Sequence, residues 1–364
     1  MRMVIACCGL EHTRRGYESF ARELFGALSG QVDVTLCKGS GKRQPNEVVV
    51  PCLRRNFLAR FMNPQTAYRW EQITFAIALF PYLILKKVDL VHYSDGTAGN
   101  ILGRLVRFTG SRVKLLLSNG GPYSAQHLRP DIFIQQICGE CYKEALAFGI
   151  APERMRLVPY GINPEQFRSS ESREAAREQF SLPHDSFVIL SVAALNRSAK
   201  RLDYLIREVA ALRDNSGFLC IAGQPTPETP GLRELAAELL PGRHIIVTVP
   251  RARIPTLLAA ADLFVLPSLA EGLPMVLLEA CSSGVPVISH NTSHFQWALG
   301  DAALYIDMAA PGALVSKIQE VASQPEVLRR FSVLGKTRAE NCYSWNVLIP
   351  RYLKMYESVL SAWR

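Results

Sequence analysis

The chain has 364 residues, of which 48% are hydrophobic and 20% are charged. This length suits two domains, and this composition supports a buried core and excludes intrinsic disorder. Its nine cysteines are irregularly spaced, which favours reduced thiols over a disulfide framework. No apolar run reaches the ~20 residues of a membrane-spanning helix. We expect the apolar stretch at the start to be a buried strand rather than a secretory leader.

The net charge of +9 comes from the first half of the chain. Residues 1–160 hold 21 Lys or Arg and 12 Asp or Glu, whereas residues 161–364 hold 20 of each. No nucleic-acid motif accompanies the excess, so we expect no nucleic acid as a partner. An anionic substrate or an anionic membrane surface suits it better, and a solvated basic surface is the plainer alternative. Segment 54–61 mixes arginines with Phe and Leu, as interfacial segments do.

Short apolar runs alternate with amphipathic helical patterns along the whole chain. The expected strands are 3–8, 32–36, 90–92, 113–117, 187–192, 218–222, 245–247, 263–266 and 285–289. The expected helices include 17–28, a buried helix over 73–85, 202–213 and a final amphipathic helix. The strands lack polar alternation, which is typical of parallel sheets covered on both faces. The pattern predicts an α/β protein with two Rossmann-like, doubly wound domains facing a cleft.

A turn-rich segment near the middle interrupts this rhythm. It covers residues 159–164 and is followed by a polar stretch before the next strong strand. We therefore predict an N-terminal domain over 1–164, joined by the C-terminal helix 345–364, and a second domain over 165–344. In open α/β sheets, ligands bind at the carboxyl ends of the strands. The dinucleotide fingerprint G-x-G-x-x-G is absent from the sequence, which disfavours a dehydrogenase.

The most informative segment is 267–280, which follows an expected strand and opens a helix at Pro274. The first-turn N–H groups of a helix have no partner within the helix and form a seat for phosphate. Glu271 lies just outside this helix and Glu279 lies inside it, so two carboxylates flank the seat. Carboxylates accept hydrogen bonds from sugar and ribose hydroxyls. The arrangement suggests a sugar–diphosphate–ribose ligand, and the plainer alternative is a surface helix with two solvated glutamates.

This segment resembles the E-x7-E motif of retaining glycosyltransferases with the GT-B fold, specifically glycosyltransferase family 4. Other family signatures are matched in order by segments 15–18, 158–167, 190–206, 222–223 and 259–268. The resemblance covers nearly the whole chain. It is most specific in the second half and looser in the first, where acceptors differ between family members.

The resemblance assigns donor-binding roles to residues of this chain. It implies that Glu279 binds the ribose, that Glu271 binds the donor sugar, and that Lys200 neutralises the diphosphate. Other expected donor contacts are Gly16, Gly223, Gly272, Leu273, Pro274 and Met275. The arginine that usually accompanies the lysine is replaced here by Ala194. We expect Arg197 to supply the missing guanidinium, because its planar fork suits phosphate.

The first half carries three further candidates. Asn119 stands where the family often has a histidine that faces the donor sugar. Asp95, at the end of an expected strand, is a candidate for orienting the acceptor, with a turn or helix-cap role as the alternative. His127 lies downstream and is a candidate on the acceptor side, although a surface position is the plainer reading. The C-x-x-C at 138–141 lacks a second pair and is interpreted as structural.

The sequence thus predicts a retaining glycosyltransferase that uses a nucleoside-diphosphate sugar and no metal or other cofactor. Its acceptor would be a glycan, a lipid-linked or a small molecule, and an anionic membrane would be a peripheral contact. We expect a cytoplasmic enzyme, peripheral at the inner face of the membrane. The alternatives are a non-catalytic nucleotide-sugar or glycan-binding protein and a GT-B nucleotide-sugar epimerase. The donor base, the sugar and the acceptor leave no readable side-chain pattern.

Overall fold

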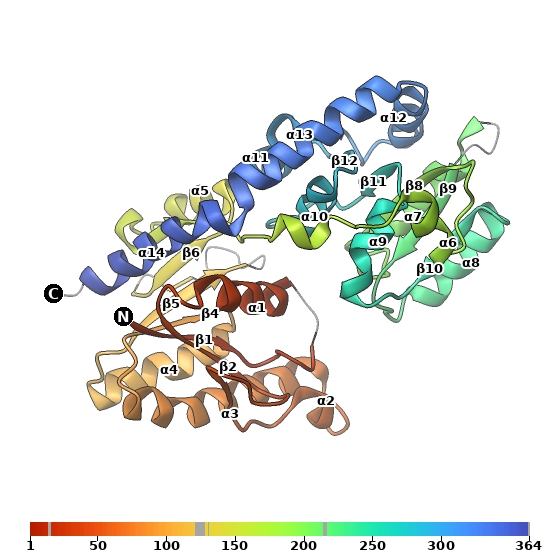
Figure 1. Ribbon diagram of the computed structural model, residues 1–364. Helices are drawn as coiled ribbons and strands as arrows, with labels where there is room; N and C mark the ends of the chain where they lie inside the picture. Colours follow the sequence, from red (N-terminus) through yellow and green to blue (C-terminus); the bar gives the residue numbers. More distant parts are fainter. Residues whose placement is uncertain (14–15, 121–127, 130, 214–216, 363–364) are drawn as a thin grey trace. The chain divides into compact units, whose positions relative to one another are not determined.

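The computed structural model describes residues 1–13, 16–120, 128–129, 131–213 and 217–362. The chain divides into two compact units. The first unit holds Met1–Gly161 and Trp345–Arg364, and the second holds Ile162–Ser344. Each unit is built on one sheet in which every strand pair is parallel. The predicted α/β class is therefore confirmed (Figure 1).

The first unit contains a seven-stranded sheet in the order β3-β2-β1-β4-β5-β6-β7. Its strands are β1 (Arg2–Cys7), β2 (Asp33–Lys38), β3 (Glu47–Val49), β4 (Leu90–Tyr93), β5 (Lys114–Asn119), β6 (Phe133–Gln136) and β7 (Met155–Leu157). Its helices are α1 (Gly16–Leu28), α2 (Arg55–Leu58), α3 (Pro64–Leu85), α4 (Gly96–Thr109), α5 (Gly139–Ala147) and α14 (Trp345–Ser361). Alternate residues of the strands face opposite layers of helices. Val4 and Val91 pack toward α3 and α4, whereas His92 faces α1 and α14.

The second unit contains a six-stranded sheet in the order β10-β9-β8-β11-β12-β13. Its strands are β8 (Phe187–Val192), β9 (Gly217–Ala222), β10 (His244–Val247), β11 (Leu263–Leu266), β12 (Val287–His290) and β13 (Leu304–Ile306). Its helices are α6 (Arg173–Gln179), α7 (Leu202–Ala210), α8 (Thr229–Leu239), α9 (Ile254–Ala259), α10 (Met275–Ser283), α11 (Ser293–Leu299), α12 (Ala313–Ala322) and α13 (Pro325–Tyr343). Leu, Ile and Val side chains from the strands and from α7, α8 and α12 form its core.

All nine predicted strands are present, with bounds that shift by up to two residues. Sequence reasoning missed β3, β6, β7 and β13, which are only three or four residues long. Such short runs carry little periodicity, so tertiary pairing rather than local pattern defines them.

The expectation of a buried helix over 73–85 was wrong in part. Helix α3 buries Phe75 and Leu79 but leaves Ile77 and Ile84 exposed, and Leu85 is 81% exposed. The helix starts nine residues earlier, at Pro64, where Asn63 caps it by accepting the Thr66 N–H. Among the helices of the described ranges, none has the length and apolarity needed to cross a membrane.

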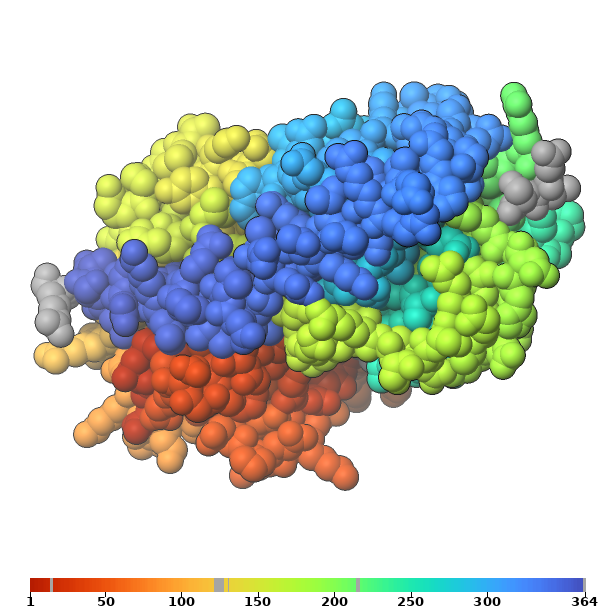
Figure 2. Space-filling view, turned by 45° about the horizontal axis from the view of Figure 1, so that its top comes forward, coloured from red at the N-terminus to blue at the C-terminus, as the bar shows by residue number. Residues whose placement is uncertain are grey.

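The C-terminal helix α14 packs on the first unit beside α1 (Figures 1 and 2). Trp345, Tyr352 and Tyr356 are almost fully buried on its inner face. Tyr352 donates its hydroxyl to the Pro159 carbonyl at 2.9 Å. The Tyr356 hydroxyl lies 3.1 Å from Nδ1 of His92, so residues 264 positions apart share one buried polar network.

His92 is held neutral inside this network. Its Nε2–H donates to Oε1 of Gln135 at 2.8 Å, and Nδ1 accepts from Tyr356. Burial lowers the pKa of His92 from 6.5 to about 4. Between these two pH values the unfolded chain binds a proton at His92 and the folded chain does not, which links stability to pH.

We predict that the free energy of unfolding falls as the pH drops from 6.5 toward 4. The folded pKa lies below the unfolded value, so the stabilisation is complete above pH 6.5 and is lost below it. The slope from this group is up to about 1.4 kcal/mol per pH unit. Urea denaturation at about pH 7 and pH 5.5 measures the change, because carboxylates titrate mainly below this pH range. His92→Gln should flatten the dependence, and the exposed His184→Gln should not. Equal slopes in both variants would contradict the prediction.

Candidate functional site

The loop that follows β8 is held rigidly by side-chain acceptors. Asn196 Oδ1 accepts the N–H groups of Ala199 and Lys200 at 3.1 and 2.8 Å. The Glu228 carboxylate accepts the N–H groups of Arg197 and Ser198 at 2.7 and 3.1 Å. These bonds lower the pKa of Glu228, with the Arg197 N–H as the largest cause. Four consecutive amides are thus satisfied, and the backbone that carries Lys200 is fixed.

Lys200 and Glu271, both predicted donor-site residues, are brought together. The ammonium of Lys200 forms an ion pair with Oε1 of Glu271, and both side chains are partly exposed. Each member therefore already has a counter-ion while a face remains open to solvent. An incoming diphosphate can compete for the lysine and release the carboxylate toward sugar hydroxyls.

Glu279 lies on α10, where the sequence placed it, and is nearly buried. Its Oε1 lies 2.9 Å from Nη2 of Arg251, whose guanidinium also lies over the ring of Phe167. Sequence reasoning missed Arg251 as a partner of this carboxylate. A buried carboxylate needs a cation or donors nearby, but the sequence contains many arginines, and none of its patterns marks this one.

The amino end of α10 differs from the expected phosphate seat in two respects. Pro274 is the residue before the helix rather than a first-turn residue. The Met275 N–H donates to the Leu273 carbonyl at 2.9 Å, and the Leu277 N–H donates to Pro274 at the same distance. These two donors are therefore used internally, because the chain makes a tight turn at Pro274. Gly272 and Leu273 lie in the loop between Glu271 and this turn.

Two further features mark the carboxyl edge of this sheet. A Cβ atom at Gly223 would lie 1.6 Å from the Ala193 carbonyl oxygen, so only glycine allows the loops after β8 and β9 to approach. The Ser268 hydroxyl, just beyond β11, is buried and has no hydrogen-bond partner among the described residues. Such an orphaned group costs about 1–3 kcal/mol unless a ligand or water satisfies it.

Arg197 is not brought to Lys200. Its Nη2 lies 2.4 Å from the position of a Cβ atom on Gly231, so the guanidinium rests on the first turn of α8. The structure gives it no contact with Lys200 or Glu271 among the described residues. Its expected role at the diphosphate thus requires the side chain to leave α8.

In the first unit, Asp95 precedes α4, but its side chain makes no helix-capping hydrogen bond. It is 5% exposed. Its carboxylate accepts the Tyr68 hydroxyl and lies 3.0 Å from the Cys8 thiol. Asp95 is thus the N-cap residue of α4 by position, but its carboxylate is bound within a polar cluster at the carboxyl ends of β1 and β4.

The other candidates in the first unit lie outside this polar cluster or outside the described residues. Asn119 ends β5 and donates its amide to Gln136 at 2.8 Å, while its buried Oδ1 has no partner among the described residues. Gly16 begins α1, and a Cβ atom there would meet nothing within 4 Å. His127 and Arg15 lie outside the described residues.

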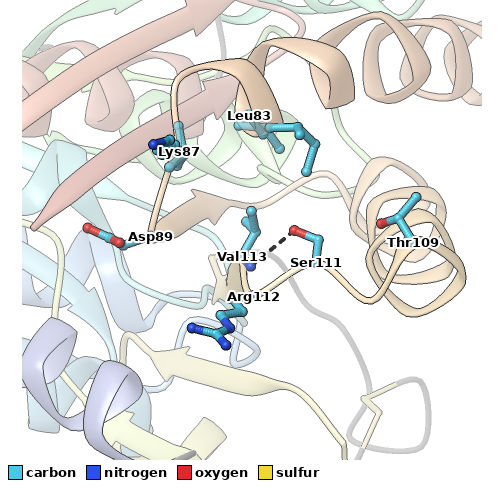
Figure 3. A pocket seen from close by; sticks show the side chains of 9 residues that line it. Leu83, Lys87, Asp89, Thr109, Ser111, Arg112 and Val113 are labelled. Carbon is cyan, nitrogen blue, oxygen red and sulfur yellow. Dashed lines mark hydrogen bonds between the residues drawn. The ribbon is translucent and has the colours of Figure 1, made fainter.

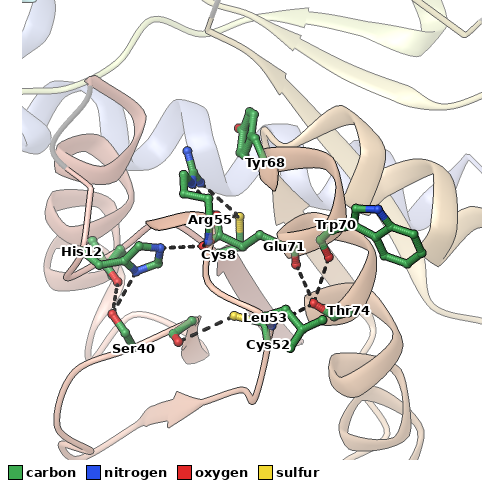
Figure 4. Close-up of polar contacts among 12 residues, drawn as sticks. Cys8, His12, Ser40, Cys52, Leu53, Arg55, Tyr68, Trp70, Glu71 and Thr74 are labelled. Carbon is green, nitrogen blue, oxygen red and sulfur yellow. Dashed lines mark hydrogen bonds and ion pairs between the residues drawn. The ribbon is translucent and has the colours of Figure 1, made fainter. Parts of the chain in front are cut away.

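A polar cluster that the sequence did not predict surrounds Glu71, a fully buried residue of α3 (Figure 4). The Glu71 carboxylate binds His12 Nε2 at 2.7 Å, the Arg55 N–H at 2.9 Å and Arg55 Nε. Burial opposes ionisation, but the bonds from His12 and Arg55 outweigh it and hold the pKa of Glu71 below its ordinary value. The cluster joins α2, α3 and the loop after β1.

A separate pocket of about 460 Å³ lies at the opposite edge of the first sheet (Figure 3). Leu83, Lys87 and Val113 are among its lining residues, and Asp89 and Val113 directly precede β4 and β5. Ligands of parallel sheets bind at the carboxyl ends of strands. This pocket at the amino ends therefore contributes none of the predicted site residues.

The C-x-x-C cysteines lie at the start of α5. Cys138 occupies the position before the helix and accepts the Cys141 N–H at 3.3 Å. The hydrogen bond from the Cys141 thiol is the main cause that lowers the pKa of Cys138. Both cysteines are free thiols.

Residues 172–338 match the family described as Glycosyl transferases group 1. The D-inositol 3-phosphate glycosyltransferase 1 of Catenulispora acidiphila is 29% identical over 231 residues, which are 60% of this chain and 54% of that protein. The MMP alpha-(1->4)-mannosyltransferase of Mycolicibacterium hassiacum is 26% identical over 59% of this chain and 51% of that protein. The match to these relatives thus spans about half of their length.

Solved structures resemble the whole chain. Sucrose-phosphate synthase from Thermosynechococcus elongatus superposes with a TM-score of 0.83 and 17% identity, covering 99% of both chains. Anabaena HepE in complex with UDP-glucose gives a TM-score of 0.77 and 14% identity, covering 98% of this chain and all of the other. At such identity the likeness establishes the fold, and the predicted GT-B fold is confirmed.

We predict that Glu228→Gln loosens the loop that carries Lys200. The neutral amide is a weaker acceptor for the Arg197 and Ser198 N–H groups, so their hydrogen exchange should accelerate by roughly fivefold. Amide exchange followed by mass spectrometry or NMR measures this. The control is Glu234→Gln, which removes the same charge from an exposed position of α8. Unchanged exchange at both amides, or equal acceleration in the control, would refute the role of Glu228.

Proposed function

We propose that this protein is a retaining glycosyltransferase that needs no metal, because residues 172–338 match the family described as Glycosyl transferases group 1. It transfers a sugar from a nucleoside-diphosphate sugar to a glycan, a lipid-linked acceptor or a small molecule. The second unit holds the donor and the first unit holds the acceptor. A non-catalytic sugar-binding protein and a nucleotide-sugar epimerase are the rival functions.

One observation carries the proposal. Two carboxylates at E-x7-E spacing, Glu271 and Glu279, are each paired with a different cation at the carboxyl edge of the second sheet. Glu279 is buried and fixed by Arg251, which suits a carboxylate that accepts two ribose hydroxyls. Glu271 is more open and is paired with Lys200, which suits a contact that is exchanged when a charged ligand enters.

The chemistry requires stabilisation of a departing nucleoside diphosphate. Lys200 provides a cation for it, and its backbone is held by Asn196, so little reorganisation is needed. The sequence has no D-x-D motif of the kind that holds a metal in other glycosyltransferases. The departing phosphate would help deprotonate the acceptor on the same face of the sugar, which retains the anomeric configuration.

We predict that the protein binds one class of nucleoside diphosphate, among UDP, GDP and ADP, with or without a chelator. Glu279→Ala removes the ribose acceptor and leaves Arg251 without its carboxylate, so affinity should fall by about tenfold or more. Lys200→Ala should weaken the binding of the nucleoside diphosphate more than the binding of the free nucleoside. Isothermal titration calorimetry measures each constant.

The matched control is Glu234→Ala, an exposed glutamate of the same unit. Absence of binding by the folded wild type, or equal binding by Glu279→Ala, would contradict the donor site. Binding that disappears with chelator would refute the metal independence. Binding without sugar transfer across an acceptor panel would favour the binding protein, and interconversion of the donor sugar would favour the epimerase.

An anionic membrane surface is the proposed peripheral contact. Four large apolar side chains, Leu53, Phe57, Phe61 and Trp70, are exposed near the start of α3. The rings of Phe57 and Phe61 contact each other at 5.5 Å, and Arg54, Arg60 and Arg69 are exposed within the same segment. Aromatic side chains beside arginines suit the boundary between headgroups and acyl chains.

We predict that the protein binds vesicles containing phosphatidylglycerol more tightly than vesicles of phosphatidylcholine alone, and that salt weakens this binding. Phe57→Ser with Phe61→Ser removes two apolar anchors and should weaken vesicle binding at least about tenfold. Phe108→Ser, at a 90% exposed position of α4, is the control. Vesicle flotation measures the bound fraction. Equal binding by the double variant and the control would contradict this surface.

A further inference from the structure

The cluster around Glu71 contains a guanidinium that is only partly used. The Arg55 side chain is 15% exposed. Its Nε and its backbone N–H are bound to Glu71, and its guanidinium carbon lies 3.9 Å from the centre of the Tyr68 ring. Within the part of the chain that the structure describes, the side chain makes one further hydrogen bond, from Nη2 to the Cys8 thiol at 3.8 Å, a weak acceptor at a long distance. The two terminal nitrogens thus have no oxygen acceptor among the described residues.

The surroundings hold this guanidinium in place. Glu71 fixes one edge, and the Tyr68 ring covers one face, as Figure 4 shows. His12 also binds Glu71, and its other ring nitrogen lies 2.9 Å from the Ser40 hydroxyl. The Ser40 hydroxyl also lies 3.1 Å from the Leu10 carbonyl oxygen. One carboxylate therefore serves both Arg55 and His12.

A second group beside it accepts rather than donates. Asp95 accepts hydrogen bonds from the Tyr68 hydroxyl and the Cys8 thiol, and a carboxylate has about four acceptor positions. Tyr68 and Cys8 each contact both Arg55 and Asp95. A free guanidinium fork and a carboxylate with spare acceptor positions thus lie within one cluster.

We infer that Arg55 is the anchor for an oxyanion, a phosphate monoester or a carboxylate, on the acceptor, and that Asp95 accepts a hydroxyl of the same molecule. A planar guanidinium with two free terminal nitrogens binds such a group through two parallel hydrogen bonds. Glu71 acts as a positioning residue, since it holds the guanidinium and does not touch the ligand. That the bound molecule is the acceptor rests on the proposed function. The presence of an oxyanion site at Arg55 does not depend on that function.

The test uses the intact protein and four probes: inorganic phosphate, glucose 6-phosphate, glucuronate and glucose. Calorimetry or ligand-observed NMR should show that wild type binds an anionic probe at least about tenfold more tightly than glucose. Arg55→Gln should abolish this preference. Arg104→Gln is the matched control, because it removes the same charge from an exposed position of α4 in the same unit and should keep the preference. A preference for glucose 6-phosphate or for glucuronate identifies the oxyanion.

Arg55→Gln removes the guanidinium from the buried Glu71 and leaves His12 as its nearest side-chain partner among the described residues, which can impair folding. The double variant Arg55→Gln with Glu71→Gln removes both charges and should fold while still lacking the preference. Glu71→Gln alone should reduce the preference less than Arg55→Gln, because the guanidinium remains but is held less firmly. Asp95→Asn should weaken the binding of glucose 6-phosphate and glucuronate and leave the binding of inorganic phosphate unchanged.

Three results would overturn the inference: no anion binding by wild type up to about 10 mM, equal binding by Arg55→Gln, or equal losses in Arg104→Gln and Arg55→Gln. Nucleotide binding is measured on the same samples. Loss of anion binding with intact nucleotide binding refutes the Arg55 site alone. Anion binding without nucleotide binding refutes the glycosyltransferase and leaves the anion site standing.

Discussion

A carboxylate that leaves water must keep a cation or hydrogen-bond donors beside it, and this constraint organises the sites of both units. Glu71 is fully buried and is bound by Arg55 and His12. Glu279 is nearly buried and is bound by Arg251. In each case the cation comes from another element of the same unit, so the ion pair ties two elements together. Both carboxylates are therefore structural supports, and Glu279 is also a candidate ligand contact.

The degree of burial separates the roles of these pairs. The pair between Lys200 and Glu271 remains partly exposed, so solvent screens it and a diphosphate can replace one partner at modest cost. Breaking a buried pair costs far more, because the remaining charge has no water. Glu71 and Glu279 therefore suit fixed frameworks, whereas Lys200 and Glu271 suit the part of the site that rearranges on binding.

The sequence predicted the parallel sheets, the final helix and the placement of Glu279 on a helix, because each depends on a local pattern of a few adjacent residues. It did not predict Arg251, Arg55 or Glu71 as site residues. Arg251 lies 28 positions before Glu279, and the contact of Arg55 with Glu71 joins a four-residue helix to α3. No spacing rule links such residues. Glu71 lies two residues before the expected apolar helix 73–85, beside Arg69 and Gln72, so no pattern in the sequence marks it as buried and in need of a partner.

The same difference explains why the resemblance was specific in the second half and loose in the first. The proposed donor segment 267–280 combines a strand end, a turn and a helix start within 14 residues, so the family resemblance is visible in one stretch of sequence. The Arg55 cluster instead draws Cys8, His12, Ser40 and Asp95 from the ends of three strands and Arg55 and Glu71 from two helices. A site assembled in this way can change its ligand by substitution in any one loop while the sheet is unaffected. The proposed acceptor site in the first unit can therefore vary without loss of the fold, whereas the proposed donor segment cannot change without altering its own turn and helix.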